Sequence, residues 1–169
     1  MLFRSTPGAF GNSNRENFIA RNVEPMGLGT RAHELALYVV LESPLQMVSD
    51  FPEHYAGQHD FEFIKQVPTT WDEVRVLDGQ PMENITLARR SGNDWYVGSI
   101  TNWDARTVRV PLSFLGEGKY IAEIYADAPD AGTNATHTTF SKQPVDRSTV
   151  LDVKMGSGGG NAIWIHPQP

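Results

Sequence analysis

Residues 68–79 read PTTWDEVRVLDG, and the pattern of apolar residues changes at this stretch. Before it, apolar side chains recur partly at helical spacing, with few turn signals between them. After it, short alternating segments are separated by glycine-rich or Asn-Asp turns, as in a series of strands. The stretch therefore divides the chain into a first part, residues 1–67, and a second part, residues 68–169.

The second part predicts about eight strands. Val108, Val110 and Leu112 alternate with Thr107 and Arg109, which is the period of a strand with one buried face. Short strands at regular intervals, joined by glycine-rich turns, are typical of an antiparallel β-sandwich. The expected strands lie around residues 73–76, 85–87, 95–99, 107–114, 120–126, 136–141, 151–155 and 162–166.

The first part predicts two helices and one short strand. Thr30 is a suitable N-cap for a helix that ends near Glu42, and both faces of this helix carry apolar residues, so it requires neighbours on nearly all sides. Residues 45–48 then indicate a short buried strand, and residues 60–66 a second helix. The fold class is therefore α+β, with too little of the α/β pattern to close a sheet by itself.

Composition narrows the class of protein. The net charge of −6 disfavours nucleic acid and anionic membranes as partners, since neither is attracted by such a field. The absence of cysteine excludes disulfides and thiolate metal sites. The first 17 residues, MLFRSTPGAFGNSNREN, contain no apolar stretch that predicts a signal peptide, and no apolar run is long enough for a membrane span.

Trp71 is followed by two carboxylates, Asp72 and Glu73, which suggests a carbohydrate-active site. A glycosidase needs two carboxyl groups that face one another at about 5–9.5 Å. Consecutive strand residues point to opposite faces, so these two cannot form that pair, and we expect solvated charges at a strand edge. The five histidines, residues 33, 54, 59, 137 and 166, show no metal-binding spacing, and we expect no metal site in this chain.

The four tryptophans could stack against sugar rings or fill the core of the sandwich. Core packing is the commoner role of Trp in strands, and Trp103, in a turn, is the one expected to be partly exposed and the candidate for sugar stacking. Asp50 follows the short apolar segment. It is a turn former if considered alone, but a site residue if that segment is a barrel strand, because the carboxyl ends of barrel strands surround the active site.

Six segments of the chain carry a family resemblance. They read STPGAF (5–10), GTRAHELALYVVLESPLQMVSDFPEHY (29–55), VPTTWDEVRVLDG (67–79), ARRSGNDWYVGSITNW (88–103), FLGEGKYIAEIYADA (114–128) and GGGNAIWI (158–165). In this order they resemble the C-terminal end of glycoside hydrolase family 97, which comprises bacterial α-glucosidases and α-galactosidases. The resemblance implies that residues 1–67 are the C-terminal remnant of a (β/α)₈ catalytic barrel and that residues 68–169 are the C-terminal sandwich.

The resemblance also carries functional expectations. The catalytic carboxylates and the calcium-binding glutamates of the family have no counterpart here, so no catalytic residue and no cofactor is assigned, and the chain alone should be inactive. Asp50, His54 and Tyr55 would line the rim of the sugar pocket. In the intact enzyme the substrates would be α-linked glucosides or galactosides, in the periplasm or outside the cell. An incomplete barrel would expose apolar surfaces and promote self-association. The alternative is a free-standing carbohydrate-binding or structural sandwich with exposed Trp side chains.

Overall fold

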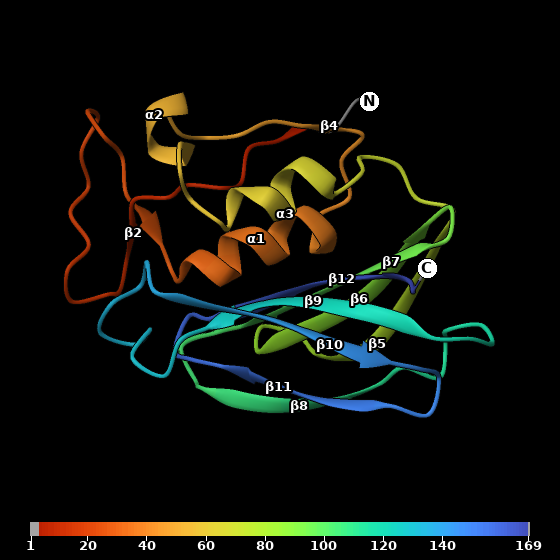
Figure 1. The fold of residues 1–169 in the computed structure, drawn as a ribbon. Helices are drawn as coiled ribbons and strands as arrows, with labels where there is room; N and C mark the ends of the chain where they lie inside the picture. Colours follow the sequence, from red (N-terminus) through yellow and green to blue (C-terminus); the bar gives the residue numbers. More distant parts are fainter. Residues whose placement is uncertain (1–3, 169) are drawn as a thin grey trace.

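The structure, a computed structural model, describes residues 4–168 and has three layers. A six-stranded sheet lies in the middle, with the helices of the first part on one face and a two-stranded sheet on the other (Figure 1). The two sheets together form the sandwich, and the first part of the chain covers its upper face. The expected combination of an α/β segment with an antiparallel β-sandwich is confirmed.

The second part forms eight strands, as predicted from its alternating pattern. The central sheet has the order β10-β9-β12-β7-β6-β5, and β11 pairs with β8 in the second sheet; all of these pairings are antiparallel. The strands are β5 (Glu73–Gln80), β6 (Asn84–Ser91), β7 (Asp94–Thr101), β8 (Arg106–Pro111), β9 (Tyr120–Asp127), β10 (Thr138–Val145), β11 (Val150–Met155) and β12 (Gly160–Pro167).

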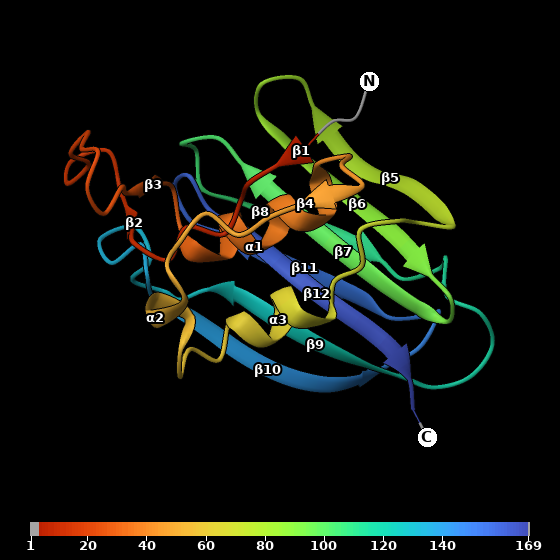
Figure 2. The same cartoon turned by 90° about the horizontal axis from the view of Figure 1, so that it is seen from above.

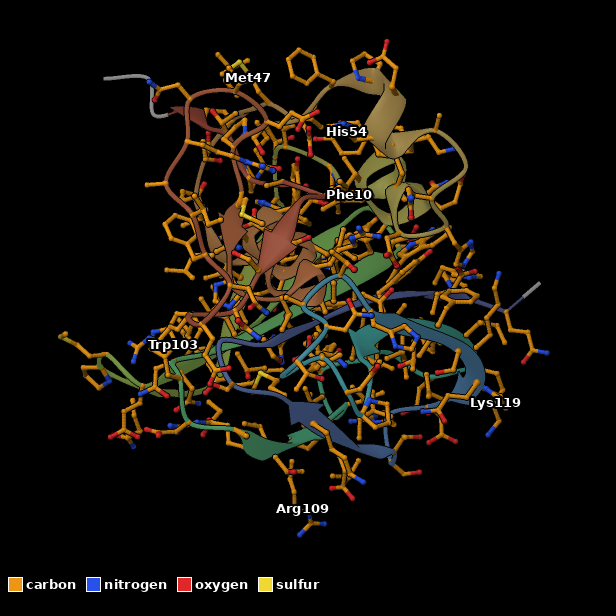
Figure 3. All side chains as sticks on the ribbon, turned by 90° about the vertical axis from the view of Figure 1, so that its left-hand side faces the viewer. Phe10, Met47, His54, Trp103, Arg109 and Lys119 are labelled. Carbon is orange, nitrogen blue, oxygen red and sulfur yellow. The ribbon has the colours of Figure 1, made fainter. Side chains whose placement is uncertain are left out.

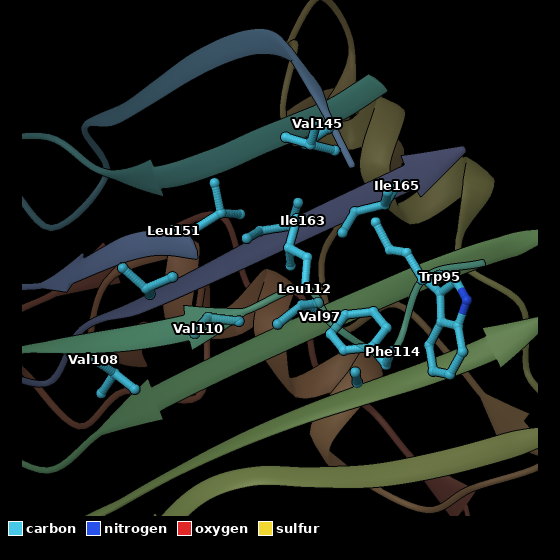
Figure 4. Close-up of a cluster of buried hydrophobic side chains, with 14 of the residues drawn as sticks. Trp95, Val97, Val108, Val110, Leu112, Phe114, Val145, Leu151, Ile163 and Ile165 are labelled. Atoms are coloured by element: carbon cyan, nitrogen blue, oxygen red, sulfur yellow. The ribbon is translucent and has the colours of Figure 1, made fainter. Parts of the chain in front are cut away.

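The core of the sandwich lies between the two sheets (Figure 4). Val97 and Ile163 from the central sheet meet Val110 and Leu112 from the β8 side, and each is fully buried. Trp95 joins this core and packs against the ring of Phe114 at a centroid distance of 4.6 Å. Alternation places every second side chain of these strands inside, which gives one face of each sheet its apolar character.

The described residues of the first part, 4–67, contain three helices and four very short strands. The helices are α1 (Arg31–Val40), α2 (Pro52–Tyr55) and α3 (Phe61–Gln66); two parallel pairs are formed by β1 (Arg4–Ser5) with β4 (Leu45–Gln46) and by β2 (Asn12–Ser13) with β3 (Gly27–Leu28). The N-cap prediction is confirmed, because Thr30 Oγ1 accepts a hydrogen bond from His33 N at 3.1 Å. Within residues 4–168, no helix is both long and apolar enough to cross a bilayer.

The prediction of a buried strand at residues 45–48 is wrong in two respects. The strand covers only Leu45–Gln46, and the side chains of Leu45, Met47 and Val48 are exposed. The physical reason is that β4 pairs with β1 alone in a two-stranded sheet, so neither of its faces is covered as in a larger sheet. The other two-residue strands were not predicted, because two residues are too few to show an alternating pattern.

Helix α1 lies directly on the central sheet, across β7 and β12 (Figure 2). Leu35, Ala36 and Val39 are fully buried in this contact, which accounts for the apolar character of the helix. Gly98 and Gly160 allow the close approach. A methyl group at Gly98 would lie 2.7 Å from Val39 Cβ, and one at Gly160 would lie 2.5 Å from His33 Cα. The sheet thus provides a glycine-lined seat for the helix.

Candidate functional site at the carboxyl end of β4

Asp50 is the centre of a hydrogen-bonded loop that follows β4. Its Oδ2 accepts from Phe10 N at 3.0 Å, and its Oδ1 accepts from Phe51 N at 2.9 Å. His54 Nδ1 lies 2.5 Å from the same Oδ1. Burial acts to raise the pKa of Asp50, but these hydrogen bonds outweigh it and lower the pKa below its usual value. Asp50 is therefore an ionised anchor, and its oxygens are occupied by the protein itself.

Tyr55 holds the same loop against the segment after β1. Its hydroxyl donates to Gly8 O at 2.8 Å and accepts from Asp50 N at 2.9 Å, and its side chain is buried. The ring packs against Phe10 on one side and stacks on Phe61 at 4.7 Å on the other. In this position Tyr55 joins three segments of the first part.

His54 is the member of this trio that faces outward. Its side chain is 40% exposed, whereas that of Asp50 is 7% exposed. Because Nδ1 is occupied by Asp50, Nε2 is the ring nitrogen left to contact another molecule. Figure 3 shows His54 in the same upper region of the molecule as Phe10 and Met47, well away from Trp103. The structure thus groups Asp50, His54 and Tyr55, and their role at a sugar pocket stays a prediction.

Two residues of α1 complete the support of the loop and were missed in the sequence. Glu34 Oε2 accepts from Gly8 N at 2.8 Å, and burial raises the pKa of this carboxyl. The Tyr38 hydroxyl lies 3.1 Å from Pro7 O and 3.2 Å from Met47 O. Gly8 has φ of 86° and a methyl group there would lie 2.5 Å from that hydroxyl. Glu34, the one acidic residue of α1, was the signal in the sequence for these contacts.

Arg31 links the loop to the sandwich. Its guanidinium donates to Phe10 O at 2.8 Å and to Gln58 Oε1 at 3.0 Å, and it lies 3.5 Å from Asp60 Oδ2. Asp60 in turn accepts from the Thr138 hydroxyl of β10 at 2.8 Å. Burial lowers the pKa of Arg31, although Asp60 acts against this shift. The site loop is therefore tied to the central sheet by a chain of polar contacts.

A pocket of about 540 Å³ opens beside this loop. Its wall is both aromatic and polar, a composition that suits small polar ligands. The lining residues are Val48, Asp50, Pro52, Tyr55, Ala56, Gly57, Gln58, His59, Phe61, Glu62 and Lys65. Within the part of the chain that the structure describes, no group of three or more His, Cys, Asp or Glu side chains could hold a metal ion.

The four tryptophans lie in different surroundings, and the role of Trp103 at a sugar stays a prediction. Trp103 is half-buried, as expected, but the guanidinium of Arg15 lies over its ring at 4.3 Å, and Gly158 packs so closely that an added methyl would lie 2.5 Å from the ring. Trp95 is in the sandwich core, whereas Trp71 and Trp164 pack against the helix-side cluster. The four Trp rings therefore do not lie exposed together on one flat face, which is the arrangement that the carbohydrate-binding alternative requires.

Asp72 and Glu73 meet the same guanidinium. Arg90 Nη1 lies 3.4 Å from Asp72 Oδ2, and Arg90 Nε lies 3.3 Å from Glu73 Oε2. The expectation that they point to opposite faces is wrong, because β5 begins at Glu73 and Asp72 precedes the strand. Both carboxylates are paired with a cation, so they are not an acid–base pair.

Comparisons with known proteins identify the arrangement. The sequence pattern of "Glycosyl-hydrolase 97 C-terminal, oligomerisation" matches residues 70–166. The "Retaining alpha-galactosidase" of Bacteroides thetaiotaomicron is 42% identical over 161 residues, which are 95% of this chain and 24% of that protein. The "Probable retaining alpha-galactosidase" of Streptomyces bingchenggensis is 33% identical, over 97% of this chain and 24% of that protein.

A solved structure gives the same result. A glycoside hydrolase family 97 enzyme from Pseudoalteromonas sp. strain K8, in complex with acarbose, superposes with a TM-score of 0.79 at 41% identity. The superposition covers 83% of this chain and 23% of that chain. This chain thus spans about a quarter of the length of the relatives that it matches.

The fold defines a class of protein: an antiparallel β-sandwich preceded by a short helical segment, which matches the C-terminal region of glycoside hydrolases. The chain belongs to glycoside hydrolase family 97 and corresponds to the C-terminal region of its members.

Proposed function

We propose that this chain is the C-terminal part of an α-glycosidase that acts on α-linked galactosides or glucosides, and that its sandwich braces the end of the catalytic barrel. The seat of α1 on the central sheet carries this proposal, because Gly98 and Gly160 let the helix backbone approach the strands without intervening side chains. A buried, apolar contact of this kind holds two parts as one body.

The partners of the described carboxylates indicate that this chain does not supply the catalytic groups of the enzyme. Asp50 is held by backbone N–H groups, and Asp72 and Glu73 share Arg90. None of these three is placed as an acid or base opposite another, so we expect the chain alone to lack hydrolase activity. The acid, the base and the calcium ligands would come from other parts of a longer protein. Its location would be periplasmic or extracellular.

Within that enzyme, His54 would contact the sugar at the rim of the pocket. Asp50 fixes the ring through Nδ1, and Nε2 then offers one hydrogen bond to a sugar hydroxyl. Tyr55 and Asp50 would act as positioning residues that keep the loop in place.

The proposal can be tested by exchange with the B. thetaiotaomicron enzyme. Replacing the matching quarter of that protein by this chain should preserve α-galactosidase activity, and His54→Ala in the chimera should raise KM more than it lowers kcat. Deletion of the matching quarter from the B. thetaiotaomicron enzyme should abolish both its solubility and its activity. If the deleted enzyme retained its activity and its melting temperature, the bracing role would be refuted.

Self-association is a second proposed function. It is favoured by the description of the matched family region as an oligomerisation module and by exposed apolar side chains in both parts of the chain. In the first part these include Leu45, Met47, Val48 and Phe51 around β4 and the site loop, where the remainder of a barrel or a second copy would pack.

A further inference from the structure

The exposed apolar side chains of the sandwich are concentrated on one hairpin. Among the described residues from 70 onward, four large apolar side chains are exposed: Val74, Val76, Met82 and Val150. The first three belong to the hairpin formed by β5 and β6, at the edge of the central sheet and to the side of α1 (Figure 2). Met82 lies in the turn after β5, whereas Val76 and Val74 lie about 13 and 20 Å along β5 from its last residue, Gln80. The three residues therefore mark one edge of the sheet, not a single patch, as a candidate contact surface.

Met82 is presented at the tip of this hairpin in a strained conformation. Glu83 N donates to Gln80 O at 3.0 Å, which closes a four-residue turn with Pro81 and Met82 at its centre. Met82 has φ of 64° in the third position, where a turn with proline second usually has glycine. The side chain is nevertheless 96% exposed, so no packing within the described chain explains the choice of methionine. Strain without an internal reason points to a role in contact with another molecule.

A hollow lies directly beside Met82. It measures about 620 Å³ and includes apolar contributions from Pro81, Ile85 and Ile100. The remaining lining residues are Gly79, Gln80, Met82, Glu83, Asn84, Thr101 and Asn102. A two-fold axis can pair a projecting side chain and a hollow on the same surface, since it brings the projection of each copy to the hollow of the other.

The charges on the hairpin allow two copies to approach. The chain carries a net charge of −6, which would oppose association over most of its surface. On the hairpin, however, Glu73 is bonded to Arg75 at 2.6 Å, and Glu83 lies 3.2 Å from Arg106. Both glutamates are therefore compensated locally, and the third carboxylate of the hairpin, Asp78, accepts a hydrogen bond from Asn84 Nδ2 at 2.5 Å.

We propose that two copies of this chain associate through the β5–β6 hairpin, each inserting Met82 into the hollow of the other, with Val76 and Val74 farther along the same edge of the sheet. This inference rests on the proposed self-association and assigns it a surface. The hairpin lies within the matched oligomerisation region, whereas Leu45 and Phe51 of the first part lie outside it. Flexible methionine side chains suit such contacts because they adapt to an irregular hollow.

Sedimentation velocity and light scattering on the whole chain, from micromolar concentration upward, test the proposal. We expect Val76→Lys and Met82→Gln each to raise the dimer dissociation constant by about tenfold or more. Val150→Lys is a matched control, since it places the same charge at another exposed strand valine of the sandwich and should leave the constant unchanged. Phe51→Ser tests the first part in the same way.

Met82→Gly separates a role of Met82 in self-association from a role in stability, because the two roles predict different changes in melting temperature and dimer dissociation constant. Glycine relieves the positive φ, so this variant should melt at a higher temperature while its self-association weakens. If Phe51→Ser weakens the dimer and the hairpin variants do not, the chain self-associates but the assigned surface is refuted. If the wild-type chain is monomeric at every concentration, both the surface and the proposed self-association are refuted, while the bracing role is unaffected.

Discussion

Substitution of Gly98 by alanine tests the contact on which the bracing role depends. The new methyl group would lie 2.7 Å from Val39 Cβ and 2.8 Å from Ala36 O, and neither atom belongs to the flexible end of a side chain. Helix α1 must therefore move away from β7. Overpacking of this kind costs about 1–3 kcal/mol, and sometimes more. Here both near contacts involve the rigid part of the helix, so we expect the upper end of that range.

One effect acts in the opposite direction. Alanine restricts the unfolded chain more than glycine does, which stabilises the folded state by about 0.4–1 kcal/mol. The expected net loss in the free energy of unfolding is therefore about 2 kcal/mol. For a protein of this size, 1 kcal/mol corresponds to about 2–4 °C, so the melting temperature should fall by roughly 4–8 °C.

The assay is urea and thermal denaturation of the whole chain, followed by circular dichroism. Gly132→Ala is the matched control, because a methyl group there meets nothing within 4 Å and the residue is exposed. Amide hydrogen exchange should show that Gly98→Ala opens α1 more than β8 and β11. If Gly98→Ala melts within a degree of the wild type while Gly132→Ala behaves as expected, the helix is not seated as described.

Three further predictions concern buried polar groups. Burial lowers the pKa of His33 despite hydrogen bonding to Gly159 and Gly158, so the unfolded state binds the proton more readily. Stability should be complete above pH 6.5 and should fall below it by up to about 1.4 kcal/mol per pH unit, and His33→Gln should abolish this slope in melts measured across that range. Burial raises the pKa of Asp127, whose Oδ2 accepts from Gly156 N at 2.8 Å and Gly160 N at 3.0 Å. Urea titration at neutral pH should show Asp127→Asn near or above wild-type stability and Asp127→Ala lower by about 2–4 kcal/mol, since only the second leaves both N–H groups unpaired. Tyr55→Phe should cost about 1–3 kcal/mol by the same titration, because it leaves Asp50 N and Gly8 O without their shared hydroxyl, and an unchanged unfolding midpoint would contradict that account.

The longer helices and strands could be predicted because their signals are local. Thr30 caps α1, and the alternation of Val108, Val110 and Leu112 marks a strand with one buried face. The relation between Asp72 and Glu73 differed from the expected one, because the two carboxylates share Arg90 instead of pointing to opposite faces. Which face a side chain points to depends on whether its residue lies inside the strand, so a shift of the strand boundary by one residue changes the prediction. Sequence patterns do not give strand boundaries to that accuracy.

The contacts that build the site could not be predicted, because they join residues far apart in the chain. Glu34 reaches Gly8 over 26 residues, and Asp60 reaches Thr138 over 78. The strand order is of the same kind, since β12 lies between β7 and β9. A hydrophobic pattern states which face is buried, but it does not state which partner buries it.

The distribution of burial explains why the first part of the chain can hold its shape on the sandwich. The face of α1 that rests on the central sheet is covered by described residues, with Leu35 and Val39 fully buried. The exposed apolar residues of the first part lie outside this contact, in β4 and the loops, as Leu45 and Phe51 do, and at Leu41, the C-cap of α1. The surface that needs a further partner is therefore separate from the surface that rests on the sheet. A longer protein could move or complete its barrel edge without disturbing the seat of α1, and this separation is what a bracing domain requires.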